Sequence, residues 1–508
     1  MRTLIIVVLL CLTLTGAVFA QDEAVQLPDT PAGRQFQLWL ESFEQGDPAA
    51  LVRYYEEQAS PEALAAIPAE GRANIESSFY RLTQGLNLHS VIESTETSLV
   101  VLAQGNLNLA WMQITLTVTP EAPHQVEMIF ISAAEPPAGS EDQPLTEEQL
   151  VADIAAYVQR LADAGAFSGT MMLTHNGETL YEGAFGLANR ETGAANTSET
   201  LFNMASMGKM FTAVAVMQLV EQGLIDVNAP ISTYLNNLPV DKASLTVHQL
   251  LTHTSGLAEM FRSPLFAEYR DNADTVSGYF PLFMDTPLQA EPGTVHQYSN
   301  SNFITLGAII EAVTGQDYFD YVQQHIFEVA GMTRTGYYER DAAVENLATG
   351  YTQMTPDMTF SGEWLSNDIH LGAKGSPAGG GYTTAGDMMA FARALLNHEL
   401  LSAETTALMF EGKVDSRPGE QYAYGFIVRA NGSVGHGGGF PGVSTYTNIY
   451  PETGYAFVVL SNEDRGGQDI VNMLDSMIDR LLTQVPLNIP LSSDPAATLP
   501  ADNIMGSP

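Results

Sequence analysis

Two residues three positions apart, Ser206 and Lys209, have the chemistry of a nucleophile and its base. Among the four lysines of the chain, Lys209 is the one with a serine three positions before it. Positions i and i+3 lie on one face of a helix, about 5–6 Å apart, so the amine can meet the hydroxyl. A serine needs a neighbour that takes its proton, and burial can lower the pKa of a lysine enough for that task. A capping serine beside a surface lysine gives the same pattern, so the surrounding residues must decide.

The residues after Ser206 predict a helix that begins at or near this serine. The stretch MGKMFTAVAVMQLVEQG places Phe211, Val214 and Leu219 on an inward face, and Gly223 ends the helix. Backbone N–H groups in a first helical turn are unpaired and carry partial positive charge, which suits an oxyanion that forms there.

A second candidate group is Tyr298 with Asn300, in the stretch EPGTVHQYSNSNF. Tyr-x-Asn also occurs at 234–236 and 446–448, so the tripeptide alone does not discriminate. Here a Pro-Gly turn precedes it and an apolar helix follows, so both side chains should protrude at a helix start. A phenol can carry a proton between serine and lysine, and an amide can orient the lysine or bind a substrate amide.

The third candidate is the glycine-rich stretch VGHGGGFPG at 434–442, which contains His436. Glycines at the start of a strand let another backbone approach, and an edge strand can offer N–H groups to a substrate. The imidazole can hold a carboxylate or tune the tyrosine. A glycine-rich turn with a structural histidine remains the alternative.

The strands that must position these groups lie on either side of a long, mainly helical segment. Alternating strands with an Asn-Gly turn are predicted at 168–186, and strands return only at 424–438 and 443–462. Between about 200 and 410 the pattern is mainly helical. Strands from the two ends must therefore pair, which gives one antiparallel sheet facing an all-helical lobe.

The first 150 residues predict a separate, smaller α+β unit. Apolar residues at helical spacing in 31–45 and an Asp47-Pro48 start predict two packed helices, and period-two patterns between 86 and 133 predict an antiparallel meander. The order of elements resembles the NTF2-like fold. Residues 134–147 are rich in Pro, Gly and acid, as in a linker.

Composition limits the function further. Residues 1–20 resemble a cleaved signal peptide, which predicts a secreted or periplasmic protein without stable membrane insertion, with an uncleaved anchor as the alternative. The one cysteine, Cys11, lies in that segment, so disulfides, a cysteine nucleophile and thiolate zinc sites are excluded from the mature chain. A net charge of −39 among 508 residues repels nucleic acid.

Taken in order, Ser206-x-x-Lys209, Tyr298-x-Asn300 and His436-Gly437-Gly438 resemble the three motifs of the serine β-lactamase-related and penicillin-binding family. The similarity is nearest to the class C β-lactamase and D-alanyl-D-alanine carboxypeptidase branch. It covers about 146–485 and includes LLTHTSGL (250–257), GGGYTTAGDMMAFARALL (379–396) and VVLSNE (458–463). It implies an α+β, β-lactamase/transpeptidase-like fold, preceded here by the small NTF2-like unit.

The resemblance also implies roles and a reaction through an acyl-enzyme, with no metal or organic cofactor. Ser206 would be acylated, and Lys209 and Tyr298 would move protons. The backbone N–H groups of Ser206 and Gly439 would form the oxyanion hole. In the family the LLTHTSGL stretch is a structural turn, so His253 is expected to be structural. The residues expected to bind substrate are Asn300, His436, Gly438 and Gly439.

His436 stands where β-lactamases usually carry a lysine, and histidine is mostly neutral at pH 7. This favours an exported hydrolase of esters or of D-amino-acid amides and short peptides, with β-lactamase as one alternative. Another alternative is a non-catalytic sensor of peptidoglycan fragments. The predicted divisions are a signal peptide at 1–20, the NTF2-like domain at 21–135, a linker at 136–147, the hydrolase domain at 148–485 and a disordered tail at 486–508.

Overall fold

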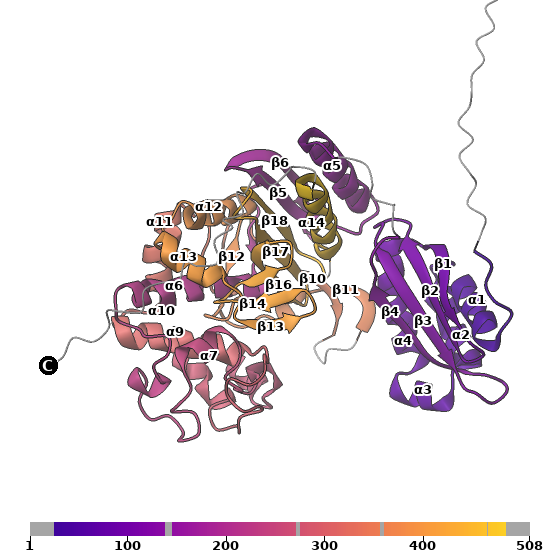
Figure 1. Ribbon diagram of the computed structural model, residues 1–508, viewed down its shortest axis with the longest axis horizontal. Helices are drawn as coiled ribbons and strands as arrows, with labels where there is room; N and C mark the ends of the chain where they lie inside the picture. Colours follow the sequence, from indigo (N-terminus) through magenta and orange to yellow (C-terminus); the bar gives the residue numbers. More distant parts are fainter. Residues whose placement is uncertain (1–24, 138–144, 271–274, 356–359, 465, 484–508) are drawn as a thin grey trace, which may run out of the picture. The chain divides into compact units, whose positions relative to one another are not determined.

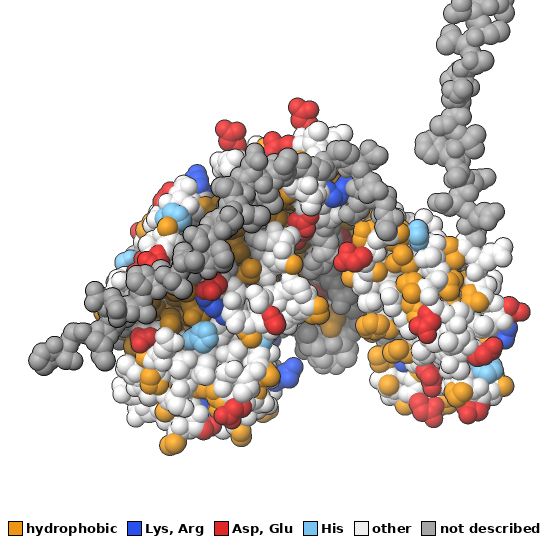
Figure 2. Space-filling model, in the orientation of Figure 1, with side chains coloured by type: hydrophobic (Ala, Val, Ile, Leu, Met, Phe, Trp, Pro, Cys, Tyr) orange, Lys and Arg blue, Asp and Glu red, His pale blue; other side chains and the backbone are white. Residues whose placement is uncertain are grey.

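The computed structural model describes residues 25–137, 145–270, 275–355, 360–464 and 466–483 (Figure 1). Contacts divide the chain into two compact units, residues 1–135 and 136–508. The predicted signal peptide and the predicted tail lie outside the described residues, as does most of the predicted linker. Acidic side chains outnumber basic ones on the visible surface of both units, in keeping with the net charge (Figure 2).

The first unit packs four helices against one face of a four-stranded antiparallel sheet in the order β1-β2-β3-β4. Thr30 caps α1 and Asp47 caps α2, each followed by proline at the first helical position. The aromatic residues of α1, among them Trp39, are buried against the sheet. Helices before a meander match the predicted order of elements, while the NTF2-like resemblance stays a prediction. The elements are α1 (Pro31–Phe43), α2 (Pro48–Gln58), α3 (Pro61–Ala66), α4 (Ala69–Thr83), β1 (Leu86–Ser94), β2 (Ser98–Gly105), β3 (Trp111–Val118) and β4 (Val126–Ala133).

The second unit is built on an eight-stranded antiparallel sheet in the order β13-β14-β15-β16-β17-β18-β5-β6. Strand β18 pairs with β5, so the predicted pairing of early and late strands is confirmed. Every residue of β18 is buried, which requires cover on both faces. Helix α12 packs on β18 and β5, α14 on β17 and α5 on β6. The strands of this sheet are β5 (Gly169–His175), β6 (Glu178–Phe185), β13 (Val414–Arg417), β14 (Glu420–Tyr422), β15 (Ile427–Arg429), β16 (Val434–Phe440), β17 (Val443–Ile449) and β18 (Tyr455–Ser461).

Helices separate β6 from β13 and form the predicted helical lobe, so the expected β-lactamase/transpeptidase-like fold is confirmed. The segment between β6 and β13 also contains the short strands β7 (Leu187–Asn189), β8 (Ala194–Ala195), β9 (Phe202–Asn203), β10 (Tyr351–Met354), β11 (Phe360–Ser366) and β12 (Tyr382–Thr383). The α-helices of the unit are α5 (Glu147–Asp163), α6 (Lys209–Glu221), α7 (Val247–Leu251), α8 (Phe266–Arg270), α9 (Asn300–Thr314), α10 (Tyr318–Val322), α11 (Glu328–Ala330), α12 (Ala385–Leu396), α13 (Ala403–Phe410) and α14 (Gln468–Thr483). Two 3₁₀ turns used below are η1 (Ala205–Gly208) and η3 (Met260–Arg262).

Helix α6 is the central helix of this lobe. Its residues from Lys209 to Met217 are buried without a break, because the sequence is apolar on all sides. Helix α9 packs beside it and is similarly buried. Lys209, the only lysine of α6, therefore lies in an apolar interior. Within the described ranges, no helix combines the length and apolarity needed to cross a bilayer.

Candidate active site

Ser206 lies in the short turn η1, directly before α6. Ala205 adopts a left-handed φ of +42°, and its N–H donates to Oδ1 of Asn203 at 2.8 Å. Gly379 packs against this turn so closely that a Cβ there would lie 2.0 Å from the Ala205 carbonyl oxygen. A non-glycine residue with positive φ costs energy, so the surrounding contacts must hold the turn in place. The turn thereby presents Ser206 at the wall of a cavity.

Lys209 is fully buried, and its ammonium contacts three oxygens. Nζ lies 3.1 Å from Oγ of Ser206, 2.7 Å from Oδ1 of Asn300 and 2.6 Å from the carbonyl oxygen of Ala378. The structure therefore brings together the serine, the lysine and the asparagine that the sequence predicted as a group. The Ala378 carbonyl, from the glycine-rich loop before β12, was not predicted, because nothing local in that loop indicates a partner for a lysine.

The environment of Lys209 changes its acidity. Burial lowers the pKa of Lys209 to about 7, and the negative charge of Glu259 acts in the opposite direction. Nζ also lies 4.9 Å from the ring centroid of Tyr298 and 5.6 Å from that of Phe303. A large share of Lys209 side chains is then neutral at neutral pH, and a neutral amine beside a hydroxyl can accept its proton.

Tyr298 precedes α9 and lines the same cavity. Desolvation by the surrounding protein raises the pKa of Tyr298 above its usual 10, although 38 % of the residue is exposed toward the cavity; a hydrogen bond with Ser206 lowers the pKa, and Glu259 raises it further. The phenol therefore keeps its proton at neutral pH and can donate it or pass it on, but does not rest as a phenolate. Tyr298 lies next to Ser206, as the sequence predicted.

Asn300 is the first residue of α9, so its predicted place at a helix start is confirmed. Its backbone N–H donates to Oε2 of Glu259 at 2.8 Å, and its Nδ2 lies 3.2 Å from the same oxygen. Sequence reasoning missed Glu259. The available signal was an acid in the mostly apolar stretch LAEMF that follows the LLTHTSGL segment.

The structure buries His436, and its predicted role in substrate binding stays a prediction. The ring is 3 % exposed and is not among the side chains that line the cavity. Nε2 lies 3.0 Å from the Tyr422 hydroxyl, and Nδ1 lies 2.6 Å from the Gly437 carbonyl oxygen. Burial, aided by the charge of Lys209, lowers the pKa of His436 to about 3. His436 is therefore neutral, turned into the protein, and occupied by protein partners on both nitrogens.

Tyr422 connects His436 to a second buried histidine, His253. The Ser299 N–H donates to Nδ1 of His253 at 3.2 Å, so His253 carries its proton on Nε2. That Nε2 lies 3.2 Å from the Tyr422 hydroxyl, which leaves the phenol proton for His436. His253 is thus a structural residue, as expected, while no sequence pattern indicated Tyr422.

The two remaining predicted residues differ in position. A Cβ at Gly438 would lie 2.3 Å from the Met204 carbonyl oxygen, so this glycine serves the close packing of β16 against the nucleophile turn. Its predicted contact with substrate stays a prediction. Gly439 lines the cavity, and a Cβ there would meet open space.

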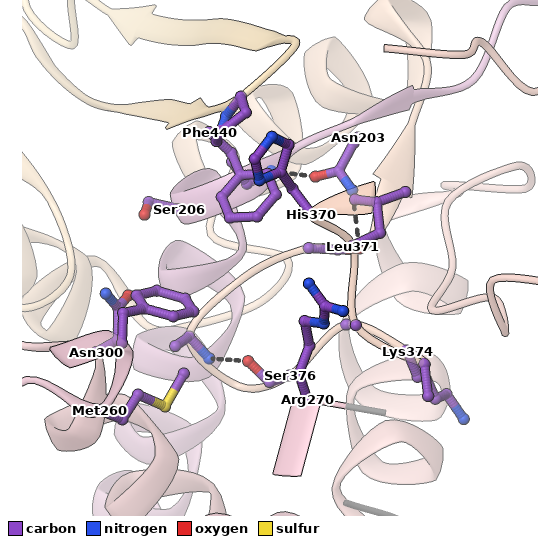
Figure 3. A pocket seen from close by; sticks show the side chains of 18 of the residues that line it. Asn203, Ser206, Met260, Arg270, Asn300, His370, Leu371, Lys374, Ser376 and Phe440 are labelled. Carbon is purple, nitrogen blue, oxygen red and sulfur yellow. Dashed lines mark hydrogen bonds between the residues drawn. The ribbon is translucent and has the colours of Figure 1, made fainter. Parts of the chain in front are cut away.

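The cavity next to Ser206 has a volume of about 800 Å³ (Figure 3). Ser206 and Asn300 lie on one side of the view, and Arg270, Leu371 and Lys374 on the other. The rings of three phenylalanines that line the cavity, Phe261, Phe266 and Phe440, form an aromatic wall. The ring centroid of Phe261 lies 4.7 Å from that of Phe266 and 6.4 Å from that of Phe440. A space of this size and polarity fits a small-molecule substrate. Among the described residues, no three His, Cys, Asp or Glu side chains are grouped so as to hold a metal.

Comparison with known proteins agrees with the family resemblance of the sequence motifs. The family description "Beta-lactamase" matches residues 154–479. A putative penicillin-binding protein, PbpX, of Bacillus subtilis is 32 % identical over 63 % of this chain and 76 % of its own. The teichoic acid D-alanine hydrolase of Staphylococcus aureus is 25 % identical over 62 % of this chain and 74 % of its own. A solved D-stereospecific amidohydrolase from a Streptomyces species superposes with a TM-score of 0.52 at 26 % identity, over 63 % of this chain and 98 % of its own.

Proposed function

The chain belongs to the Beta-lactamase family of serine hydrolases, and from this we propose that it hydrolyses esters or D-amino-acid amides and short peptides through an acyl-enzyme on Ser206. One observation carries the proposal. A buried lysine with a pKa near 7 lies 3.1 Å from a serine hydroxyl at the wall of a cavity of about 800 Å³. This is the arrangement that turns a serine into a nucleophile.

In the first step, Ser206 attacks the carbonyl carbon of the substrate. The proton of its hydroxyl passes to the neutral Nζ of Lys209, which becomes an ammonium, and a new C–O bond forms. The ammonium is stabilised by the oxygens of Asn300 and Ala378, which already lie within 2.7 Å of Nζ. Because these acceptors are in place beforehand, little reorganisation accompanies the transfer.

The negative charge on the former carbonyl oxygen needs N–H donors. Pro441 and Gly442 form a two-residue turn between β16 and β17, with Phe440 and Val443 as the closing pair. Closing pairs of such hairpins exchange hydrogen bonds and the next pair does not, so the Gly439 N–H points away from β17. Gly439 and Ser206 line the same cavity, and their N–H groups are our candidates for the oxyanion hole.

Collapse of the tetrahedral intermediate breaks the bond to the leaving alcohol or amine. The leaving group takes a proton from Tyr298, which is replenished from the Lys209 ammonium through the group of contacts around Ser206. Water then attacks the acyl-enzyme, gives its proton to the same pair and releases the acid. The pair returns this proton to Oγ of Ser206, so the complete cycle restores the serine, lysine and tyrosine to their starting protonation states.

The substrate class follows from His436. A β-lactam carries a carboxylate, for which a permanent cation is the natural partner. His436 is neutral and engaged by Tyr422 and Gly437, so that cation is missing at this position. Two charged side chains that line the cavity, Arg270 and Lys374, lie across it from Ser206 (Figure 3). Neutral esters and D-amino-acid amides are therefore favoured over β-lactams.

The test is turnover with three chromogenic substrates and one covalent probe. p-Nitrophenyl butyrate and D-alanine p-nitroanilide should give many turnovers per enzyme, with a higher kcat/KM than a chromogenic cephalosporin. A fluorophosphonate should label the native chain and leave Ser206→Ala unlabelled. Cephalosporin turnover faster than both other substrates would make the protein a β-lactamase. Labelling limited to one equivalent without turnover would make it a sensor.

We further propose that the protein is exported, with residues 1–20 as its signal peptide, and is secreted or periplasmic. This rests on the apolar run that follows Arg2 and on the small residues that end it. The proposed divisions are an NTF2-like domain at 21–135, a linker at 136–147, the hydrolase at 148–485 and a tail at 486–508. Mass spectrometry of protein isolated from the producing cells tests export, since the expected mature N-terminus is Gln21.

A further inference from the structure

The carboxylate of Glu259 lies directly behind Asn300 and so far has no role in the proposed reaction. Its Oε2 accepts from the backbone N–H of Asn300 at 2.8 Å and lies 3.2 Å from Nδ2 of the same residue. Its Oε1 accepts from the Phe261 N–H at 3.1 Å. Three N–H groups therefore fix this half-buried carboxylate in one place.

This contact decides which end of the Asn300 amide faces Lys209. A side-chain amide has an acceptor oxygen and a donor NH₂ group of nearly equal size, so its orientation follows its partners. An ionised carboxylate only accepts, so the NH₂ end must face Glu259. The oxygen is then left for Nζ of Lys209, at 2.7 Å. A reversed amide would place NH₂ against the lysine and offer it no acceptor.

The backbone around Glu259 is attached to the start of α9. The carbonyl oxygen of Ala258 accepts from Oγ of Ser301 at 2.6 Å and from Oγ of Ser299 at 3.3 Å. The carboxylate and Asn300 are thus positioned by the same few residues. The fold therefore sets the position of the Glu259 carboxylate behind the Asn300 amide.

The charge of Glu259 also acts on the catalytic groups. It raises the pKa of Lys209 against the effect of burial, and it raises that of Tyr298. Lys209 in turn lowers the pKa of both histidines near it. The titratable groups around this cluster are Lys209 on α6, His253 after α7, Glu259 before η3, His296 and Tyr298 before α9, Tyr422 on β14 and His436 on β16.

We propose that Glu259 is a positioning residue of the hydrolase. Its carboxylate holds the amide oxygen of Asn300 toward Lys209, and its charge balances the ammonium that forms when Lys209 takes the proton of Ser206. Glu259 exchanges no proton in the proposed reaction. The inference rests on the proposed acyl-enzyme mechanism, because it concerns the lysine that serves as base there.

The test is the pH dependence of kcat/KM for p-nitrophenyl butyrate in variants of the full chain. Glu259→Gln keeps an acceptor for the Asn300 N–H but removes the charge, so the pKa of Lys209 falls. The acid limb of the profile should then move to lower pH by about 1 unit, because an opposite charge close by shifts a pKa by at least that much. Glu259→Ala removes the orientation as well and should lower the plateau about 100-fold. Glu404→Gln, an exposed acid on α13, is the matched control and should match the native profile.

Glu259→Asp distinguishes the effect of the charge from the effect of side-chain length. It also serves as the test if the other variants fold poorly. It keeps the charge but is one methylene shorter, so the plateau should fall while the acid limb stays in place. An unchanged limb in folded Glu259→Gln, or a native plateau in Glu259→Ala, would overturn the inference. Neither result touches the proposed function, which is tested separately by the turnover and labelling of the native chain and of Ser206→Ala.

Discussion

Each unit of the chain buries an ionisable side chain whose pKa lies near 7, but only one of the two is built for chemistry. In the first unit, burial raises the pKa of Glu76 to about 7, against hydrogen bonds from Tyr55 and Trp39 and the charge of Arg72. Trp39 donates to one carboxylate oxygen at 2.9 Å, and the Tyr55 hydroxyl donates to the other. In the second unit, burial lowers the pKa of Lys209 to about 7.

The difference lies in what the two groups face. Both oxygens of Glu76 are used by core side chains of the same unit, so its proton has no reacting partner there. Lys209 instead reaches a serine hydroxyl that lines a cavity. A perturbed pKa therefore indicates burial first, and indicates catalysis only where a nucleophile and room for a substrate lie beside it.

The largest expected effect comes from removing the amine itself. Lys209→Ala should lower kcat/KM for p-nitrophenyl butyrate about 10³-fold or more, because it removes the general base. Lys242→Ala is the matched control, since Lys242 is also buried at 2 % exposure but pairs with Asp241 and not with a serine. Similar losses in both variants would show that burial of any lysine, rather than its partner, explains the effect.

The buried acid of the first unit should control stability rather than rate. The pKa of Glu76 rises from its ordinary 4.5 to about 7 on folding, so the folded state binds the proton more tightly. The contribution of Glu76 to stability is then fully present below pH 4.5 and is lost as pH rises toward 7, in total about 3 kcal/mol. This loss can be measured by hydrogen exchange of residues 31–83. The native and Glu76→Gln chains are compared between pH 4.5 and pH 7.

Two results would break this side of the comparison. The pH-dependent loss of protection should be absent in Glu76→Gln, and its presence there would assign it to other groups. Hydrolysis by Glu76→Gln should equal that of the native chain, and a loss would give the first unit a part in the reaction.

The acid limb of the native rate profile gives a smaller but independent test. Lys209 accepts a proton only when neutral, so kcat/KM should rise with pH through about 7. Each pH unit below that value should cost about tenfold. His436 should leave no sign in this range, because its pKa is lowered to about 3. A profile that is flat between pH 5 and 7 would contradict Lys209 as the base.

The smallest effect concerns two exposed phenylalanines, one in each unit. Phe261 lines the cavity and is 44 % exposed, while Phe130 on β4 is 56 % exposed. Phe261→Ala should reduce the preference for p-nitrophenyl butyrate over the acetate about fivefold, because apolar contact with two methylene groups contributes about 1 kcal/mol or more. Phe130→Ala should leave the ratio unchanged. An equal ratio in the native chain, Phe261→Ala and Phe130→Ala would show that the aromatic wall does not contribute to substrate selection.

The sequence predicted what depends on local pattern. The start of α2 at Asp47 and Pro48, the strands on either side of the Asn176-Gly177 turn, and the place of Asn300 at a helix start all follow from short-range rules. The nearness of Ser206 and Lys209 follows from helical spacing. These expectations agree with the structure because neighbours in sequence decide them.

What the sequence could not predict depends on distant contacts. Glu259 meets Asn300 across 41 positions, and the Ala378 carbonyl meets Lys209 across 169. The side chain of His436 could have pointed into the cavity or the interior, and the packing of β16 together with Tyr422 on β14 turns it inward. The cavity itself depends on loops whose approach no spacing rule describes.

The most direct test of the account is the site of the covalent intermediate. The native chain is mixed rapidly with p-nitrophenyl butyrate, quenched in acid, digested and analysed by mass spectrometry. We predict a butyryl group on Ser206, absent from Ser206→Ala and from a sample left until the substrate is exhausted. A butyryl group on another residue, or undiminished turnover by Ser206→Ala, would contradict the account.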